Sequence, residues 1–165
     1  SKDCPSFGGV YKLAAVKDKE TGTFIPKIKL SENAEKITNP GDKTIYRIYQ
    51  KSTGKIIADL ICLTEEHYDA KNSLLLFDPV ETWKKTRLAP NSYNMREMMI
   101  PIFKDGKCIY HSPKVMDIQS YCKQELDTLW DESRRLINPH EVHVDLSNKL
   151  WHMKNQLLDS YHYGE

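Results

Sequence analysis

A continuous set of helix signals between Ser112 and Pro139 constrains the fold more than any other stretch of the chain. Ser112 can accept a hydrogen bond from a free N–H group of a first helical turn, and Pro113 is tolerated directly after it. Asn138-Pro139 ends the pattern. Apolar residues recur at spacings of three and four, which is typical of one helical stripe: Val115, Ile118, Cys122, Leu126, Leu129 and Leu136. We therefore predict an amphipathic helix of about 25 residues that packs on a sheet, with Cys122 in the core.

Most of the chain before this helix has the composition of β-strands. Residues 9–16 are apolar enough for a strand that is buried on both faces. Gly54 and Asp105-Gly106 supply the turns of two hairpins. Residues 80–93 match neither a strand pattern nor a helix pattern, although Trp83 and Leu88 indicate packing against the core. Short apolar or β-branched runs predict strands at residues 9–16, 24–30, 43–50, 55–63, 73–77, 98–103 and 107–110.

A second helix is predicted at the C-terminus. Residues 140–144 are short and extended, and then Asp145 or Ser147 can cap a helix that carries Leu150, Met153 and Leu157 on one side. The predicted fold class is therefore α+β. It is a small, mostly antiparallel sheet with hairpins, packed against the long amphipathic helix and the C-terminal helix.

Composition excludes several classes of protein. A length of 165 residues suits one domain with a real core. Lysine and arginine number 24 against 23 acidic residues, which argues against a nucleic-acid partner bound through bulk charge. No apolar run approaches the roughly 18 residues of a membrane helix, and no signal-peptide pattern is seen. We expect a cytoplasmic protein with reduced cysteines and no membrane partner. The loop-like start without Met suggests a piece of a longer protein.

Local motifs for metal binding or catalysis are weak. His140 and His143 are three apart after a proline, whereas the zinc-protease pattern needs a spacing of four on a helix. Alternating strand geometry would put these two histidines on opposite faces. Cys108 and His111 have no second close pair that would complete a tetrahedral site. We predict no metal ligand, and no nucleophile, base and acid stand together in a recognised motif.

The basic residues of the first fifty positions allow two interpretations. Several of them lie near predicted strand ends or near the bend at Asn39-Pro40-Gly41. They form either a solvated charged rim or an edge that binds phosphate, since lysine supplies a point charge to phosphate oxygens. The residues are Lys12, Lys29, Lys36, Lys43 and Arg47.

An ordered series of short motifs resembles the C-terminal part of the nicotinate phosphoribosyltransferase family. The early motifs are Pro5-Ser6-Phe7-Gly8-Gly9-Val10-Tyr11-Lys12-Leu13, Ile28-Lys29-Leu30-Ser31, Lys36, Thr38, Pro40-Gly41, Lys43 and Arg47. The late motifs are Leu129-Trp130-Asp131-Glu132, Arg135, Asn138-Pro139, Val144-Asp145-Leu146-Ser147 and Leu150-Trp151. The resemblance covers nearly the whole chain.

This resemblance implies an enzyme of NAD synthesis. The family joins nicotinate to phosphoribosyl pyrophosphate, giving nicotinate mononucleotide and pyrophosphate, with ATP hydrolysis through a phosphorylated histidine. ATP and Mg are expected for the full enzyme, and none is expected to be bound by this fragment. By resemblance, residues 1–25 hold the last strand and exit loop of the α/β barrel of type II phosphoribosyltransferases, and residues 26–165 form a C-terminal α+β domain. The implied partners are the rest of the chain and a second subunit in a homodimer.

The resemblance also suggests phosphate-binding residues, but no catalytic residue within this stretch. Related enzymes bring basic residues from this region to phosphates in the neighbouring subunit's site. By position, Ser6 and Lys29 are the first candidates and Lys12 and Lys43 the next, for ATP or pyrophosphate bound across the dimer. The isolated chain is expected to be inactive, because the phosphohistidine and the ribose-binding groups lie before it. A non-catalytic scaffold or a nucleotide-sensing module is the alternative.

Overall fold

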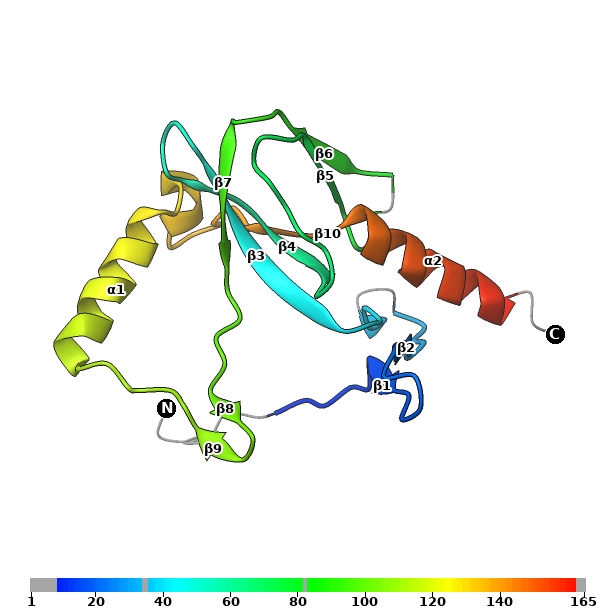
Figure 1. The fold of residues 1–165 in the computed structure, drawn as a ribbon. Helices are drawn as coiled ribbons and strands as arrows, with labels where there is room; N and C mark the ends of the chain where they lie inside the picture. Colours follow the sequence, from blue (N-terminus) through cyan, green and yellow to red (C-terminus); the bar gives the residue numbers. More distant parts are fainter. Residues whose placement is uncertain (1–8, 34–35, 82, 163–165) are drawn as a thin grey trace. The chain divides into compact units, whose positions relative to one another are not determined.

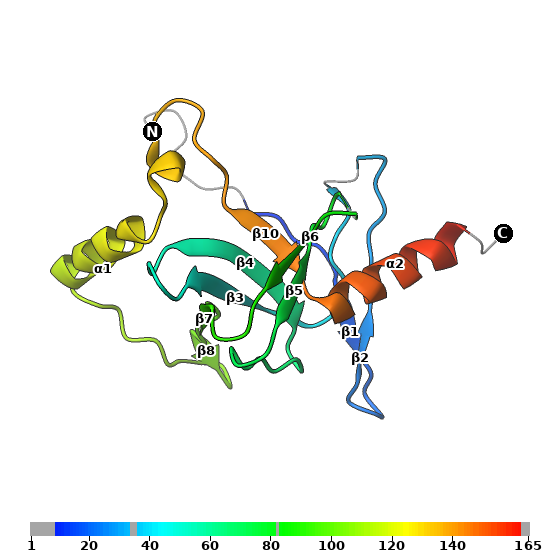
Figure 2. The same ribbon diagram turned by 90° about the horizontal axis from the view of Figure 1, so that it is seen from above.

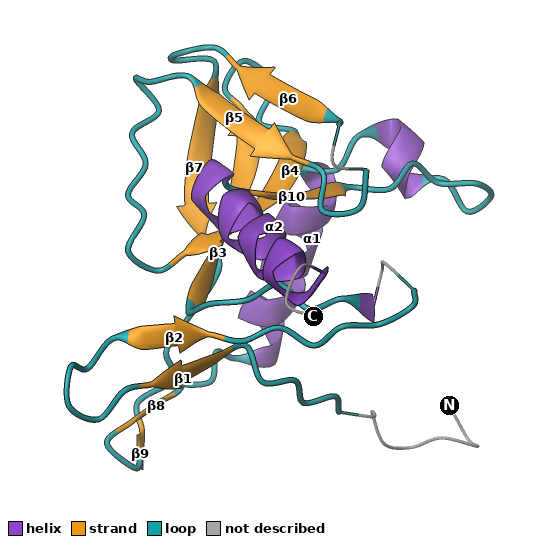
Figure 3. Cartoon of the chain, turned by 90° about the vertical axis from the view of Figure 1, so that its right-hand side faces the viewer, coloured by secondary structure: helices purple, strands orange, loops and turns teal. Residues whose placement is uncertain are grey.

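The computed structural model describes residues 9–33, 36–81 and 83–162, and its largest element is a six-stranded sheet (Figures 1 and 3). All neighbouring strands of this sheet are antiparallel except one pair. The parallel pair lies at the centre of the sheet and consists of the fourth strand of the chain and the last one. The prediction of an α+β fold with a mostly antiparallel sheet is confirmed. In spatial order the strands are β6 (Lys85–Leu88), β5 (Leu74–Phe77), β10 (His143–Leu146), β4 (Ile56–Leu63), β3 (Lys43–Gln50) and β7 (Tyr93–Glu97).

The chain divides into two compact units. One consists of residues 43–151 and contains the six-stranded sheet. The other consists of the described residues among 1–42 and 152–165. It contains the hairpin of β1 (Ala15–Lys17) and β2 (Phe24–Pro26), together with most of the C-terminal helix α2 (Asn148–His162). The predicted boundary between residues 25 and 26 would separate the end of the barrel from the C-terminal domain in a longer protein, and it stays a prediction.

Alternation along the strands builds the core of the sheet unit. Ile48 on β3, Leu60 on β4 and Leu76 on β5 are completely buried, and they pack with Tyr93 of β7 in one cluster. Because successive side chains of a strand point to opposite faces, the period of two in the sequence puts these residues on the same side. The predicted strands 43–50, 55–63 and 73–77 match β3, β4 and β5 to within one residue.

Both predicted hairpin turns are present. Gly54, in the longer loop between β3 and β4, has a φ of 70°. Asp105 and Gly106 have φ of 49° and 74°, the left-handed backbone that a two-residue hairpin loop requires. The second turn joins β8 (Phe103–Lys104) to β9 (Lys107–Cys108). The predicted strand at 98–103 is wrong except for Phe103. The chain pairs with β3 before that point, through β7, and Pro101 has no N–H group to continue a ladder.

Two further expectations about the strands are corrected. Of the predicted strand at 9–16, only Ala15 and Val16 belong to β1, and Val10 is 83% exposed, so a strand buried on both faces is wrong. The ambiguous stretch 80–93 contains β6 and the first residue of β7. Leu88 packs against the core as expected, whereas Trp83 is exposed.

The long predicted helix is about half its expected length. Helix α1 spans Val115–Asp127, or 13 residues, and its N-cap position is Lys114 instead of Ser112. All of α1 is described, and it contains no buried residue, so the expectation that its apolar stripe packs on the sheet is wrong. Cys122, predicted to lie in the core, is exposed.

Contacts with Lys55 and with Ile56, the first residue of β4, explain why α1 ends early. The Lys55 ammonium group donates hydrogen bonds to the carbonyl oxygens of Asp127 and Leu129, at 2.9 and 2.8 Å. The N–H of Ile56 donates to the carbonyl oxygen of Thr128 at 2.9 Å. These donors satisfy carbonyl groups that a continuing helix would have used internally, and they turn the chain back along the sheet. A short 3₁₀ helix, η2 (Asp131–Arg134), follows.

A buried polar cluster fixes the start of α2. Ser147 accepts a hydrogen bond from the N–H of Leu150 at 3.1 Å and donates to Glu66 at 2.6 Å. Glu66 also accepts from the N–H of Leu63, at 2.8 Å. Ser147 is therefore the helix cap, in place of the alternative Asp145. Among the helices that the structure describes, none is long and apolar enough to cross a membrane.

Candidate functional site

Two of the predicted phosphate-binding residues share one loop cluster in the unit that contains β1. The Lys12 ammonium group donates to the carbonyl oxygen of Lys36 at 3.3 Å. The N–H of Lys29 donates to Thr38 Oγ1 at 2.8 Å, and the Lys29 carbonyl oxygen accepts from the N–H of Thr38 at 3.4 Å. Residues 36–38 therefore contact both predicted lysines, and the side chains of Lys12, Lys29 and Lys36 are exposed. Ser6 lies outside the described residues.

The bend at Gly41 closes this loop on the start of β1. The carbonyl oxygen of Ala14 accepts hydrogen bonds from the N–H groups of Lys27 and Gly41, both at 2.8 Å. Gly41 has a φ of 90°, which a side chain would strain. The Asn-Pro-Gly sequence thus returns the chain to β1, and this return brings residues 36–38 to Lys12 and Lys29.

The remaining basic candidates lie in the sheet unit. Lys43 is the first residue of β3 and is half-buried. Arg47, further along β3, forms two hydrogen bonds to the Asp59 carboxylate, both at 2.8 Å. The bonded carboxylate raises the pKa of Arg47. Arg47 is therefore committed to a cross-strand ion pair, and we no longer count it among the phosphate ligands.

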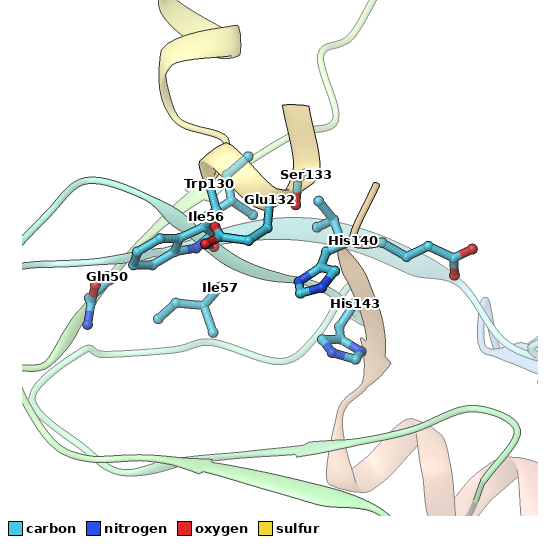
Figure 4. A pocket seen from close by; sticks show the side chains of 10 residues that line it. Gln50, Ile56, Ile57, Trp130, Glu132, Ser133, His140 and His143 are labelled. Atoms are coloured by element: carbon cyan, nitrogen blue, oxygen red, sulfur yellow. Dashed lines mark hydrogen bonds between the residues drawn. The ribbon is translucent and has the colours of Figure 1, made fainter. Parts of the chain in front are cut away.

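The sheet unit also contains an open cavity of about 560 Å³ (Figure 4). Trp130 forms part of its wall and donates its indole N–H to the carbonyl oxygen of Ile56 at 2.7 Å. His140 and His143 both line the cavity, so the expectation that they lie on opposite faces is wrong. Strand β10 begins only at His143, and strand alternation does not apply before it. The lining residues are Gln50, Ile56, Ile57, Trp130, Glu132, Ser133, His140, Glu141, Val142 and His143.

The lining of this cavity combines apolar and polar side chains. The residues that line it include His140, His143, Glu132 and Glu141, which carry polar groups, and the apolar Ile57. Within the described ranges, no three His, Cys, Asp or Glu side chains are arranged to hold a metal ion. The cavity can therefore present hydrogen-bond donors and acceptors to a ligand, without a metal centre built from these residues.

A charged network on the sheet was missed by the sequence reasoning. Glu125 of α1 accepts two hydrogen bonds from Arg96 of β7, at 2.8 and 2.7 Å, and lies 3.6 Å from Arg47. These bonds hold the pKa of Glu125 below its ordinary value. Arg96 also stands over the ring of Tyr49 at 5.5 Å. The hairpin register, which places Arg47 opposite Asp59, was the one available signal.

Comparison with known proteins gives one family. Residues 42–154 match the family described as "Nicotinate phosphoribosyltransferase C-terminal domain". The chain is 38% identical over 156 residues to nicotinate phosphoribosyltransferase of Bacillus subtilis, covering 94% of this chain and 31% of that protein. It is 33% identical over 155 residues to the Caenorhabditis elegans protein of the same name, covering 93% of this chain and 26% of the relative.

A solved structure has the same fold. The crystal structure of human nicotinic acid phosphoribosyltransferase superposes with a TM-score of 0.62 at 24% identity, over 73% of this chain and 24% of the human one. The chain thus spans 31%, 26% and 24% of the length of these three proteins. The family match covers more than half of the chain, including every strand of the large sheet. The chain therefore belongs to the nicotinate phosphoribosyltransferase family, as its C-terminal domain.

Proposed function

We propose that this chain is the C-terminal domain of an enzyme that makes nicotinate mononucleotide and pyrophosphate from nicotinate and phosphoribosyl pyrophosphate, in NAD biosynthesis. The observation that carries the proposal is the family match over residues 42–154. The relatives from Bacillus subtilis and Caenorhabditis elegans bear the name of this activity. In the proposed reaction, ATP hydrolysis with Mg drives the transfer, and the enzyme works in the cytoplasm as a homodimer.

The domain's proposed role is to supply positive charge to phosphate groups bound across the dimer. Lys12 and Lys29 support this role because both side chains are exposed and lie on one loop cluster. Lys43 and Ser6 are the further proposed ligands, from the resemblance alone. Ammonium groups held near pyrophosphate or the ATP γ-phosphate offset the charge that develops during transfer.

By this proposal the isolated chain does not catalyse the reaction. The groups that carry the phosphoryl group and place the ribose would lie in the barrel that precedes the C-terminal domain. Support comes from the relatives' lengths, since the chain covers 31% and 26% of the two described above. Positioning of both substrates supplies much of the rate of such transfers, and it requires the missing part.

The proposal is tested by measuring the formation of nicotinate mononucleotide in two preparations. One is the full-length protein that contains this chain, and the other is the chain of residues 1–165 alone. Both receive nicotinate, phosphoribosyl pyrophosphate, Mg and ATP. We expect turnover and coupled ATP hydrolysis only from the full-length protein. No turnover by the full-length protein would refute the enzymatic assignment, and turnover by the chain alone would refute its dependence on the barrel.

A further inference from the structure

A continuous stretch of 28 residues, 99–126, departs from the six-stranded sheet and buries no side chain. We call it the arm. It begins after β7, forms the β8–β9 hairpin, and continues through α1 to the point where the chain returns to the sheet (Figures 1 and 2). Every residue of the arm is described, and all are exposed except the half-buried Glu125.

The arm is rich in large apolar side chains. Eleven of them are exposed within these 28 residues, including Ile100 and Phe103 before the hairpin turn and Val115, Met116 and Ile118 on α1. Phe103 is 70% exposed and Val115 is 79% exposed. So many exposed large apolar side chains in one stretch of chain indicate an interaction site, because contact of apolar groups with water is unfavourable. A helix of 13 residues is itself marginal in water without a surface to pack on.

The arm is nevertheless fixed at both ends. At its start, the N–H of Met98 donates to the carbonyl oxygen of Ile45 at 2.8 Å. At its end, Glu125 is held by Arg96, and Lys55 binds the last carbonyl groups of α1. Both ends of the arm are therefore held on the sheet. A segment that is held at both ends loses less conformational entropy when it docks than a free segment does.

Charge and chain length indicate what covers the arm. It contains four lysines and three acidic residues, so it has no strong field of either sign. A nucleic acid or an anionic membrane would need a basic surface, whereas the apolar surface of a protein suits this balance. The relatives continue beyond the matched region for about two thirds of their length or more, since this chain covers 31% and 26% of them. A segment of the same polypeptide is tethered, and the tether gives it a high effective concentration at the arm.

We propose that the arm docks on the part of the same polypeptide that precedes this C-terminal domain. The inference rests on the proposed function, which places the domain at the end of a longer enzyme. It goes further by assigning residues 99–126 as the docking element and the chain's own preceding segment as the occupant. A second copy of the protein is the competing occupant.

Native cysteines report whether the arm is covered. Cys108 and Cys122 lie on the arm and are exposed in this structure, whereas Cys62 lies in the core. Burial raises the pKa of Cys62 to about 12, so Cys62 serves as an unreactive internal control. In the native full-length protein we expect a maleimide reagent to modify Cys108 and Cys122 at least about tenfold more slowly than in urea. Modification of both at the rate of the unfolded protein would overturn the proposal.

Cross-linking identifies the occupant. Unlabelled and ¹⁵N-labelled full-length proteins are mixed, unfolded and refolded together, and then cross-linked with an amine-specific reagent. We expect the arm lysines Lys104, Lys107, Lys114 and Lys123 to form same-label links to residues that precede the domain. Links of mixed label in their place would assign the arm to a second copy and overturn the proposal. So would a failure to find any link from the arm to the preceding residues.

Two substitutions on α1 make a matched pair. Ile118→Asp puts a charge on the apolar face, and Ser120→Asp puts the same charge on the polar side, where the helix has room for it. In the full-length protein we expect Ile118→Asp to raise the labelling rate of Cys122 several-fold and Ser120→Asp to leave it unchanged. Equal rates in the two variants would count against docking through the apolar face.

Mononucleotide formation by the same preparations separates this inference from the proposed function. An active enzyme with a freely reactive arm would refute the docking alone. A protected arm, linked to its own chain in a protein without nicotinate turnover, would refute the enzymatic assignment alone.

Discussion

Arg96 of β7 forms a bidentate ion pair with Glu125 of α1, with Nη1 2.8 Å from Oε1 and Nη2 2.7 Å from Oε2. The same carboxylate lies 3.6 Å from Arg47, which is itself bonded to Asp59. Helix α1, which is described over its whole length, buries no side chain. Its position on the sheet therefore depends on this charged contact and on the backbone bonds at its end.

Removing the charge of Glu125 should loosen α1. We expect Glu125→Gln to lower the free energy of unfolding of the 165-residue chain by about 1 kcal/mol, because the pair is charge-assisted yet partly exposed to solvent. Hydrogen exchange of the α1 amides should accelerate more than that of β4. Glu65→Gln is the control, since its pair with Lys149 is 3.7 Å long and exposed. An equal loss in both variants would contradict the special role of Glu125.

The same contact gives a pH dependence. Bonds from Arg96 hold the pKa of Glu125 below its ordinary value of 4.5. A depressed folded-state pKa means that the stabilisation is complete above the unfolded value and is lost as pH falls through the folded one. The difference in unfolding free energy between wild type and Glu125→Gln should therefore be constant near pH 7 and shrink below about pH 4.5. Urea denaturation across this range measures it, and a constant difference down to about pH 2 would be inconsistent with the assigned shift.

The core of the sheet should be sensitive to cavity formation at Leu60. This residue lies on β4, between β3 and β10 in the sheet, and is completely buried in the core cluster. We expect Leu60→Ala to cost about 2–5 kcal/mol of unfolding free energy, through lost apolar contact and the cavity left behind. Leu136 is 100% exposed, so Leu136→Ala provides the same chemical change without a cavity. If the two variants had the same denaturation midpoint, the assignment of Leu60 to the core would be wrong.

The start of α2 should depend on the hydroxyl group of Ser147. Ser147→Ala removes both the cap of the Leu150 N–H and the bond to Glu66. We expect a loss of about 1–2 kcal/mol, the usual range for a helix cap. The matched control is Ser160→Ala on the same helix, where the hydroxyl only donates to the Leu157 carbonyl oxygen in an exposed position. Thermal denaturation of both variants gives the comparison.

Steady-state kinetics of the full-length protein test the proposed role of Lys29. Lys29→Ala should raise the apparent KM for ATP or phosphoribosyl pyrophosphate by about tenfold, the effect of losing roughly one charge-assisted bond. The KM for nicotinate should change much less. Lys19 is also exposed, in the turn after β1, and Lys19→Ala should leave all constants unchanged. Unchanged KM values in Lys29→Ala would indicate that Lys29 belongs to a solvated charged rim and does not bind phosphate.

Local sequence signals predicted the sheet better than the helices. The period of two along 43–50 and 55–63 survives in the structure because the buried partners of those strands are sequence neighbours across the Gly54 turn. The 112–139 helix pattern was continuous, yet the helix stops at Asp127. Lys55, which lies 74 positions before Leu129, supplies the contact that redirects the chain.

In the candidate site too, local signals predicted some features, and residues distant in the sequence decided others. The proximity of Lys12 and Lys29 followed from the position of the bend at Gly41, a local signal. The shared cavity of His140 and His143 did not, because it depends on how Trp130 and Ile57 stand against β10. The ion pair of Arg47 was not predicted either, because its partner Asp59 lies on the neighbouring strand.

The sequence by itself determined strands β3, β4 and β5 of the sheet, the two glycine turns and the family. Each of these is written in neighbouring residues or in the order of short motifs. Only the tertiary structure decided where α1 ends, which charges are already paired, and that the apolar stripe from Val115 to Leu126 stays exposed. The physical reason is that amphipathic periodicity specifies a face to be buried but not the surface that covers it. That surface comes from residues distant in the chain.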